Sequence, residues 1–434
     1  MALLGLIFLA AACETNFVNP NAPTDEQILN TREGLINLGL GIKQLYSTSG
    51  MRWLIETPAI TAREGGITTT FQNMIELEDG GSELPNFNSN VSGLWATMLR
   101  VMVMCDDVID NVDGVELADD TRNSLFATAT TFKAMAIGAL AQHYEQVVIQ
   151  PSGDNNANFV SQQAGYEEAV RLLESAESAL GGSVDATIQS SILGGMDLLN
   201  TIYAMQARFH LFAGNNQAAI AAAQQVDRSV ASVFEYDVLN QNPIWARVYL
   251  NNAPNFKPRD NFGLPTDEFT YDADDGRLDF YLIPLDETNQ NGLPIEDLAG
   301  FFTGNVDPIP VYLPGEMDLI IAEAQARSGN LQAAIDALNE VRTKTSDEDP
   351  FGIGADLTAY SGGQTADAVL LDIYQNRRAE LFLTGMSLED SRRFDRPEPS
   401  GQAMQFDEER NRNFYPFPIR ERSNNPNTPP DPAI

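Results

Sequence analysis

Apolar residues recur at helical spacing along several long stretches of the chain. Between Ile28 and Leu45 they are separated by three, four or seven positions, which is typical of an amphipathic helix. The preceding residues Thr24–Gln27 fit a capping box, so we expect this helix to begin there. A strongly apolar helix is expected over Trp95–Val108, whereas the polar, glycine-rich stretch Arg63–Asn90 predicts a long functional loop.

A short internal repeat indicates how the later helices are arranged. The sequence Gly214–Ile220 recurs at Gly329–Ile335, and both copies read Gly-Asn-x-Gln-Ala-Ala-Ile. A helix, a Gly-Asn turn and a second helix with small residues at the crossing are typical of a tetratricopeptide-type pair. Glycine at the turn supplies the left-handed conformation that ends the first helix. The expected helices are 204–213 and 217–226 for the first copy, and 319–328 and 331–341 for the second.

The repeats are interrupted rather than continuous. An earlier pair is predicted at 132–144 and 166–180, and the segment 230–310, rich in Asn, Pro, Asp and aromatic residues, separates the two later pairs. We therefore predict a mostly α fold: a tetratricopeptide-like helical-hairpin scaffold with large irregular loop insertions and little β structure. It would form a single domain over residues 24–434, with helical repeats at about 126–229 and 311–396 and insertions at about 63–90 and 230–310.

The N-terminus predicts export and lipidation. The apolar run Ala2–Leu9 is too short to cross a bilayer, which needs about 20 residues. It leads through three alanines to Cys13, as the apolar region of a secretory signal leads to its cleavage site. Because bacterial lipoproteins are cut before such a cysteine and acylated on it, the stretch resembles a lipoprotein signal. We predict a signal peptide over 1–12, lipidation of Cys13 and an extended tether over 13–23.

Charge restricts the partners. The chain of 434 residues carries a net charge of -35, which repels nucleic acid phosphates and anionic lipid headgroups. A nucleic acid partner is therefore excluded from the interpretation. Only four of the 26 basic residues are lysines. Adaptation of the surface to high salt and lineage composition alone explain this bias equally well, and both stay open.

Little in the sequence supports catalysis, and we predict a protein that is not an enzyme and needs no cofactor. The only histidines, His143 and His210, lie in alanine-rich helices where packing is the expected role. No nucleophile elbow, phosphate loop or zinc spacing occurs. Cys105 lies in an apolar run and is expected to be a buried, inert thiol. No metal is predicted. Four aspartates form a weak calcium candidate, but an acidic turn without a metal is the favoured interpretation of them: Asp272, Asp274, Asp275 and Asp279.

Several segments spread over nearly the whole chain occur in a characteristic order. After the lipoprotein signal they are Asn19–Thr24, Trp95 with the helix after it, Ala204–Ile220, Asp275–Leu278, Asp318–Val341, Asn376–Leu381 with Asp390–Arg396, and the Tyr-Pro-x-Pro strand at Asn413–Ile419. With these segments in this order the chain resembles the SusD/RagB family. Gly276 replaces the proline of the family's Asp-Pro-Arg-Leu segment.

The resemblance implies a cell-surface lipoprotein of the outer membrane that captures an oligosaccharide and delivers it to a SusC-like TonB-dependent transporter. It also implies a scaffold of tetratricopeptide-type pairs whose irregular insertions form the binding face. The best-matched charged residues, Arg377, Arg378 and Glu380, are then expected to be an ion-paired part of the scaffold rather than ligand contacts.

The two irregular stretches contain the residue types that bind sugars. Aromatic faces stack on the C–H groups of a pyranose, and amides, carboxylates and guanidinium groups match its hydroxyls. Trp245 is the strongest single candidate because it lies in the interruption between repeats, whereas Trp53 and Trp95 are expected in the core. The predicted ligand-binding residues are Arg63, Phe71, Asn73, Asn86, Phe87, Trp245, Arg247, Tyr249 and Tyr271.

Two other functions compete with glycan binding. A repeat-based assembly lipoprotein that holds protein partners would show continuous repeats without aromatic-bearing insertions. A secreted glycoside hydrolase would need two carboxylates at a defined separation with oppositely tuned pKa values, which spacing along the chain does not reveal.

Overall fold

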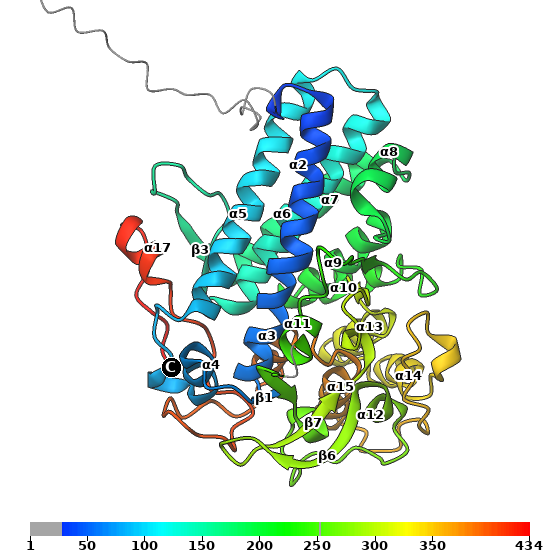
Figure 1. The fold of residues 1–434 in the computed structure, drawn as a ribbon. Coiled ribbons are helices and arrows are strands. Elements are labelled where there is room, and N and C mark those ends of the chain that lie inside the picture. Colours follow the sequence, from blue (N-terminus) through cyan, green and yellow to red (C-terminus); the bar gives the residue numbers. More distant parts are fainter. Residues whose placement is uncertain (1–27, 251–252) are drawn as a thin grey trace, which may run out of the picture.

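The computed structural model describes residues 28–250 and 253–434. The predicted signal peptide, the lipidation site Cys13, the tether and the capping box at Thr24–Gln27 lie outside the described residues. Figure 1 shows two halves of different character. Long helices stand side by side in one half, and shorter helices, a β-hairpin and irregular segments make up the other.

The long helices follow the predicted apolar pattern. Helix α2 (Arg32–Leu45) continues through a π-helical segment, Tyr46–Gly50, into α3 (Met51–Thr61). Beside α2 lie α5 (Ser89–Asn111) and α6 (Asp119–His143). Among the described residues, α6 is the one helix with the length and composition to cross a membrane, but 94% of its most apolar stretch is buried in the fold. It is therefore the central core helix of the scaffold.

The predicted helical pairs are confirmed. Helix α6 packs against α7 (Gln162–Leu180), α9 (Leu198–Phe212) against α10 (Asn216–Ala223), and α13 (Pro314–Arg327) against α14 (Leu331–Arg342). The mostly α, tetratricopeptide-like fold class is thereby confirmed.

The two copies of the Gly-Asn turn have the same geometry. Gly214 and Gly329 are left-handed, with φ of 79° and 82°. In each copy the amide of the following asparagine donates to a carbonyl five residues back, at 2.8 Å from Asn215 to His210 and 2.9 Å from Asn330 to Gln325. The repeated sequence therefore forms the same turn in both copies.

The stretch predicted as a loop over Arg63–Asn90 is in part helical, which corrects that prediction. Helix α4 (Gln72–Asp79) lies within it and buries Met74 and Leu77 on one face, and β1 (Gly65–Ile67) precedes it. The two apolar side chains are three positions apart, and the only other apolar residue of the helix is Ile75, so the sequence shows too few apolar positions to indicate a helical period.

The large insertion 230–310 is tied to the rest by short strands. Strands β4 (Val233–Phe234) and β8 (Ile309–Pro310) pair with each other and close its two ends. Strand β5 (Phe256–Pro258) pairs antiparallel with β1, so backbone hydrogen bonds connect the insertion to the stretch that precedes α4. The remaining elements are the hairpins β2 (Gln146–Val148) with β3 (Phe159–Ser161) and β6 (Leu282–Thr288) with β7 (Pro294–Leu298), and the helices α8 (Ala186–Ile188), α11 (Trp245–Val248), α12 (Gly276–Tyr281), α15 (Ala366–Glu380), α16 (Ser387–Arg393) and α17 (Ile419–Asn424).

Buried ion pairs connect α13, α15 and α16. Arg377 makes a bidentate pair with Asp390, with both N–O distances at 2.9 Å. Glu323 on α13 accepts hydrogen bonds from Arg393 and Arg327 and is fully buried. The neighbouring Arg378 and Glu380 are also buried and paired. Residues 377–381 are therefore part of the scaffold, as predicted.

Replacement of Glu323 should change the acid stability of the fold. Burial alone would raise the pKa of Glu323, but Arg393, Arg377 and Arg327 outweigh burial and lower the pKa to about 2. The carboxylate therefore stabilises the fold above pH 4.5, and this contribution is lost as the pH falls from about 4.5 toward 2. We expect Glu323→Gln to lower the free energy of unfolding at neutral pH by about 3–5 kcal/mol, because it removes one carboxylate from a buried cluster and leaves Arg377 and Arg393 to share Asp390.

Denaturant unfolding of the wild type and the variant across that pH range is the measurement. The difference between the two proteins should shrink steadily below pH 4.5, and Glu340→Gln on the exposed face of α14 should behave as the wild type does. A difference that is independent of pH would contradict this assignment.

Candidate functional site

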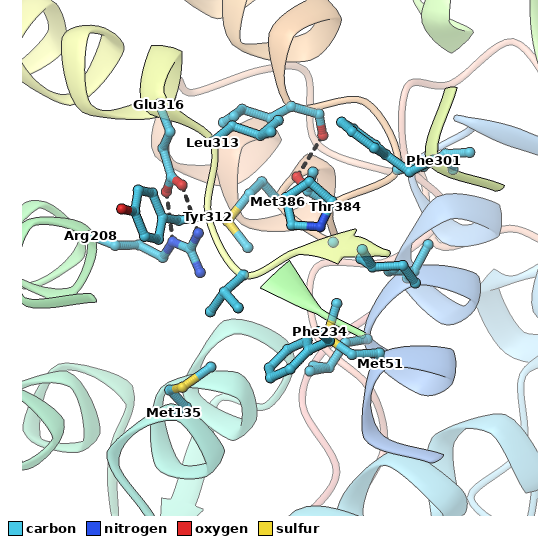
Figure 2. A pocket seen from close by; sticks show the side chains of 18 of the residues that line it. Met51, Met135, Arg208, Phe234, Phe301, Tyr312, Leu313, Glu316, Thr384 and Met386 are labelled. Carbon is cyan, nitrogen blue, oxygen red and sulfur yellow. Dashed lines mark hydrogen bonds and ion pairs between the residues drawn. The ribbon is translucent and has the colours of Figure 1, made fainter. Parts of the chain in front are cut away.

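One internal cavity lies at the centre of the fold, between the helical pairs and the strands β4 and β8 (Figure 2). Arg208 and Glu316 face each other across one of its walls and form a bidentate pair with both N–O distances at 2.6 Å. Its volume is about 50 Å³. Ligand pockets usually measure about 300–1,000 Å³, so this cavity is a feature of the core and has no room for a sugar ring.

A buried carboxylate joins the two irregular stretches. Glu56 on α3 is fully buried, and Oε1 accepts a hydrogen bond of 2.9 Å from the Asn90 amide. Both of its oxygens also accept from the guanidinium of Arg247, with Nη2 at 3.1 Å from Oε1. Asn90 in turn accepts from the side-chain amide of Asn73. Two predicted site residues that are far apart in the sequence, Asn73 and Arg247, are therefore connected by hydrogen bonds through Asn90 and Glu56.

Backbone contacts support the same junction. The amide of Thr68 donates to the carbonyl of Asn255 at 3.0 Å, next to the β1–β5 pair. The amide of Asn255 donates to the carbonyl of Arg247 at 2.7 Å. In Figure 1, α3, β1 and α11 lie where the two halves of the molecule meet. The junction is thus held by a buried ion pair, amide hydrogen bonds and a short sheet.

Aromatic side chains that reach solvent lie close in the chain to the residues of this junction. Phe71, which precedes α4, and Phe87, which precedes α5, are 56% and 66% exposed. Trp245 is half-buried, and it begins α11 at a turn where the Asn242 side chain accepts its amide at 3.0 Å. The Asn242 side chain is buried and also donates to two carbonyls, so the turn presents Trp245 in a fixed place.

Trp53 was expected in the core and is instead half-buried. The guanidinium of Arg52 lies 4.0 Å above its ring, and the ring packs closely against Gly93 of α5. A side chain at Gly93 would clash with the indole, which explains the glycine there. Trp95 is buried as predicted, with its indole N–H donating to Glu421 at 3.1 Å.

An open groove of about 720 Å³ lies between Phe87 with the first turns of α5 and the helix α17. Its volume is that of a small-ligand site. The C-terminal segment contributes one of its walls, which the sequence did not predict because the residues of α17 show no distinctive pattern. The lining includes Phe87, Ser92, Gly93, Trp95, Leu99, Pro151, Ile419, Arg420, Asn424 and Asn425.

Several predicted ligand residues are structural in this fold. Arg63 is buried, and its guanidinium donates to the carbonyls of Glu78 and Gln405 at 2.8 and 2.9 Å. Tyr271 is buried against Phe262, and the half-buried Tyr249 donates its hydroxyl to a backbone carbonyl. The remaining predicted residue, Asn86, is half-buried, and its carbonyl accepts from the Ile419 amide at 2.9 Å.

The weak calcium candidate is not assembled. Asp275 caps α12 and forms a buried bidentate pair with Arg277, with N–O distances of 2.9 and 2.7 Å. Asp272 accepts from the Asp274 amide within the same turn. Within residues 28–250 and 253–434, no three histidine, cysteine or acidic side chains are placed to share a metal ion. The buried carboxylate of Asp275 is therefore already paired with the guanidinium of Arg277, and Asp279 lies within α12.

Of the remaining titratable candidates, His143 and Cys105 are buried in the core and His210 is half-buried. Burial lowers the pKa of His143 to about 4, and its Nδ1 lies 2.7 Å from the carbonyl of Ala139. Burial also lowers the pKa of His210. The thiol of Cys105 is fully buried, and burial raises its pKa well above the usual value. None of the three side chains belongs to the junction at Glu56.

Comparison with known proteins agrees with this architecture. The model of the SusD family matches residues 303–429, which include the ion-paired segment of α15 and α16. The SusD/RagB resemblance is confirmed. A SusD superfamily protein from Bacteroides thetaiotaomicron superposes with a TM-score of 0.69 at 17% identity, over 93% of this chain and 100% of that one.

Two further SusD-type structures come from Bacteroides vulgatus. A SusD superfamily protein gives a TM-score of 0.70 at 14% identity, over 93% of this chain and 99% of that one. A SusD-like carbohydrate binding protein gives 0.63 at 14% identity, over 85% and 84% of the two chains. No curated protein matches the sequence. At these identities the structures establish a SusD-like fold, and the carbohydrate binding named for one of them is a property of that protein.

Loss of the Glu56 charge should loosen the junction. Glu56→Gln keeps the shape of the side chain but leaves the guanidinium of Arg247 without its carboxylate, so we expect a loss of about 3–5 kcal/mol in the free energy of unfolding. Hydrogen exchange should become faster in the amides around β1 and β5 before it does in the helical pairs. Glu83→Gln, at an exposed carboxylate, is the matched control and should change neither quantity. Equal stability of the two variants would show that Glu56 does not hold the junction.

Proposed function

We propose that this SusD-like chain is a glycan-binding surface protein, and that the junction at Glu56 with its bordering aromatics forms the ligand face. The carrying observation is that Glu56 connects Asn73, through Asn90, to Arg247, and that the exposed Phe71 and the half-buried Trp245 each precede one of these two residues by two positions in the chain. Rings that reach solvent offer faces to pyranose C–H groups, and the amides and the charged pair nearby offer partners for hydroxyls. The SusD-like carbohydrate binding protein from Bacteroides vulgatus supports the same class of ligand.

The net charge narrows the proposed ligand. At -35 the protein repels sulfated and other polyanionic polysaccharides, so the proposed ligand is a neutral or weakly charged oligosaccharide. The proposed role is capture rather than hydrolysis. The buried carboxylate of the junction, Glu56, is held by Asn90 and Arg247, which leaves it no free oxygen to transfer a proton to a glycosidic bond. Sugar release from a panel of polysaccharides would instead favour the glycoside hydrolase alternative.

Trp245→Ala should weaken glycan binding without unfolding the protein. Removal of one stacked aromatic face costs roughly 1–3 kcal/mol, so we expect the dissociation constant to rise by about 5-fold to 150-fold. Affinity electrophoresis through neutral polysaccharides would identify a ligand, and calorimetry would compare the variants. Leu371→Ala, at an exposed apolar residue of α15, is the control and should bind as the wild type does. Unchanged binding by a folded Trp245→Ala protein would remove this residue from the site, and loss of folding would place it in the core.

We further propose that Cys13 is acylated, that the protein is held at the outer membrane, and that it delivers its ligand to a SusC-like TonB-dependent transporter. The apolar run before Cys13 and the SusD-like fold support this assignment. One acyl chain gives only weak membrane attachment, so several chains are expected on the mature cysteine.

Mass spectrometry of the mature protein should find an N-terminal peptide that begins at Cys13 and carries acyl chains. Cys13→Ser should move the protein from the membrane fraction into the soluble fraction, and Cys105→Ser should not, because Cys105 is buried in the core. An unmodified Cys13 in the mature protein would contradict the anchor, and it would leave the glycan-binding face untouched.

A further inference from the structure

A second cavity lies on a different face, where the end of α2 meets the segment after β4. Its volume is about 380 Å³, and its lining comes from the last turn of α2, the π-helical segment and residues 235–240. None of the junction residues at Glu56 lines it. π-Helical turns interrupt regular helices and are frequently found at functional sites. The side chains that give the cavity its chemistry are Lys43, Ser47, Thr48, Glu235, Tyr236 and Asp237.

Lys43 is buried in this cavity without a partner. It is 9% exposed, and within the described residues its ammonium group makes neither a hydrogen bond nor an ion pair. A largely buried ammonium group that has no acceptor from the protein is costly, because part of its hydration is lost and no protein group replaces it. Burial accordingly lowers the pKa of Lys43, while the nearby Glu235 acts in the opposite direction. An unpartnered cation of this kind indicates a ligand that supplies acceptors.

The carboxylate of Glu235 lies near the ammonium group of Lys43, next to Gly194. A methyl group added at Gly194 would lie 2.5 Å from Glu235 Oε2 and 3.4 Å from Lys43 Nζ, so both charged groups border this glycine without forming an ion pair. Glu235 Oε2 accepts from the amide of Gly195 at 2.9 Å, which fixes the carboxylate. The hydroxyl of Tyr236 donates to the carbonyl of Ser47 at 2.8 Å and holds the cavity wall against the π-helical segment.

The charges select one class of ligand. An anion would be repelled by Glu235 and Asp237, a cation would be repelled by Lys43, and an apolar molecule would leave the ammonium group unpaired. A hydroxyl group satisfies both sides, because its oxygen accepts from Lys43 and its hydrogen donates to Glu235. We propose that this cavity is a second binding site, separate from the Glu56 junction, for a small neutral polyhydroxylated molecule such as a monosaccharide or a sugar alcohol.

The low lysine content makes a direct test possible. Reductive methylation with ¹³C-formaldehyde labels the four lysines of the intact protein, and Lys43→Gln identifies the Lys43 signal by its loss. D-Glucose and xylitol are the probes, and sodium acetate is the anionic control. We expect the neutral probes to shift the Lys43 signal in a saturable way while the signals of Lys133, Lys257 and Lys344 stay in place. Acetate should shift none of them.

Two variants separate this site from the proposed glycan face. Glu235→Gln should weaken the response of the Lys43 signal several-fold, whereas Trp245→Ala should leave it unchanged. A Lys43 signal that does not move with the neutral probes, or that moves with acetate, would overturn the proposal. Neither result bears on oligosaccharide binding at the Glu56 junction, because the two sites share no residue.

Discussion

The hydrogen-bonded carboxylate of Glu56 is the constraint on which the candidate site depends. It is fully buried at the middle of α3, where a charge without partners would be strongly destabilising. Its partners come from two distant segments, Asn90 at the start of α5 and Arg247 in the large insertion. If either segment moved away, the buried carboxylate of Glu56 would lose a partner, which is unfavourable. The irregular stretches are therefore fixed against the scaffold, and so are the aromatic residues within them.

The scaffold uses the same physical device at a second place. The charged cluster of Glu323, Arg377, Asp390 and Arg393 connects the last helical pair to α15 and α16. Such clusters are poor sources of net stability but strongly disfavour alternative packings, since every member must find its partner. The SusD-family segment at 303–429 contains this cluster. The match therefore includes this buried cluster, and the junction residues Glu56, Asn73, Asn90 and Arg247 lie outside it.

The sequence predicted the scaffold well and the site only in part. Helical periodicity and the repeated Gly-Asn turn are local signals, so the ends of α9 and α13 and the starts of α10 and α14 were predicted to within one residue. Helices α9 and α13 begin six and five residues before their predicted starts. Helix α4 was missed because only Met74 and Leu77 mark its buried face. Asn73 and Arg247 are among the residues predicted from the two stretches, and the structure connects them. Glu56, which connects them through Asn90, was not selected, because it lies in an apolar helix. Arg63 and Tyr271 looked like ligand residues and are buried, since composition does not show which way a side chain points.

Whether the two insertions act as one ligand face is best decided by hydrogen exchange with a bound oligosaccharide. The account predicts that a saturating neutral oligosaccharide slows exchange together in two segments, residues 68–90 and residues 244–250 with 253–256, while the amides of α13 and α14 are unaffected. Protection confined to one of the two segments, or centred on the helical pairs, would contradict a face built around Glu56.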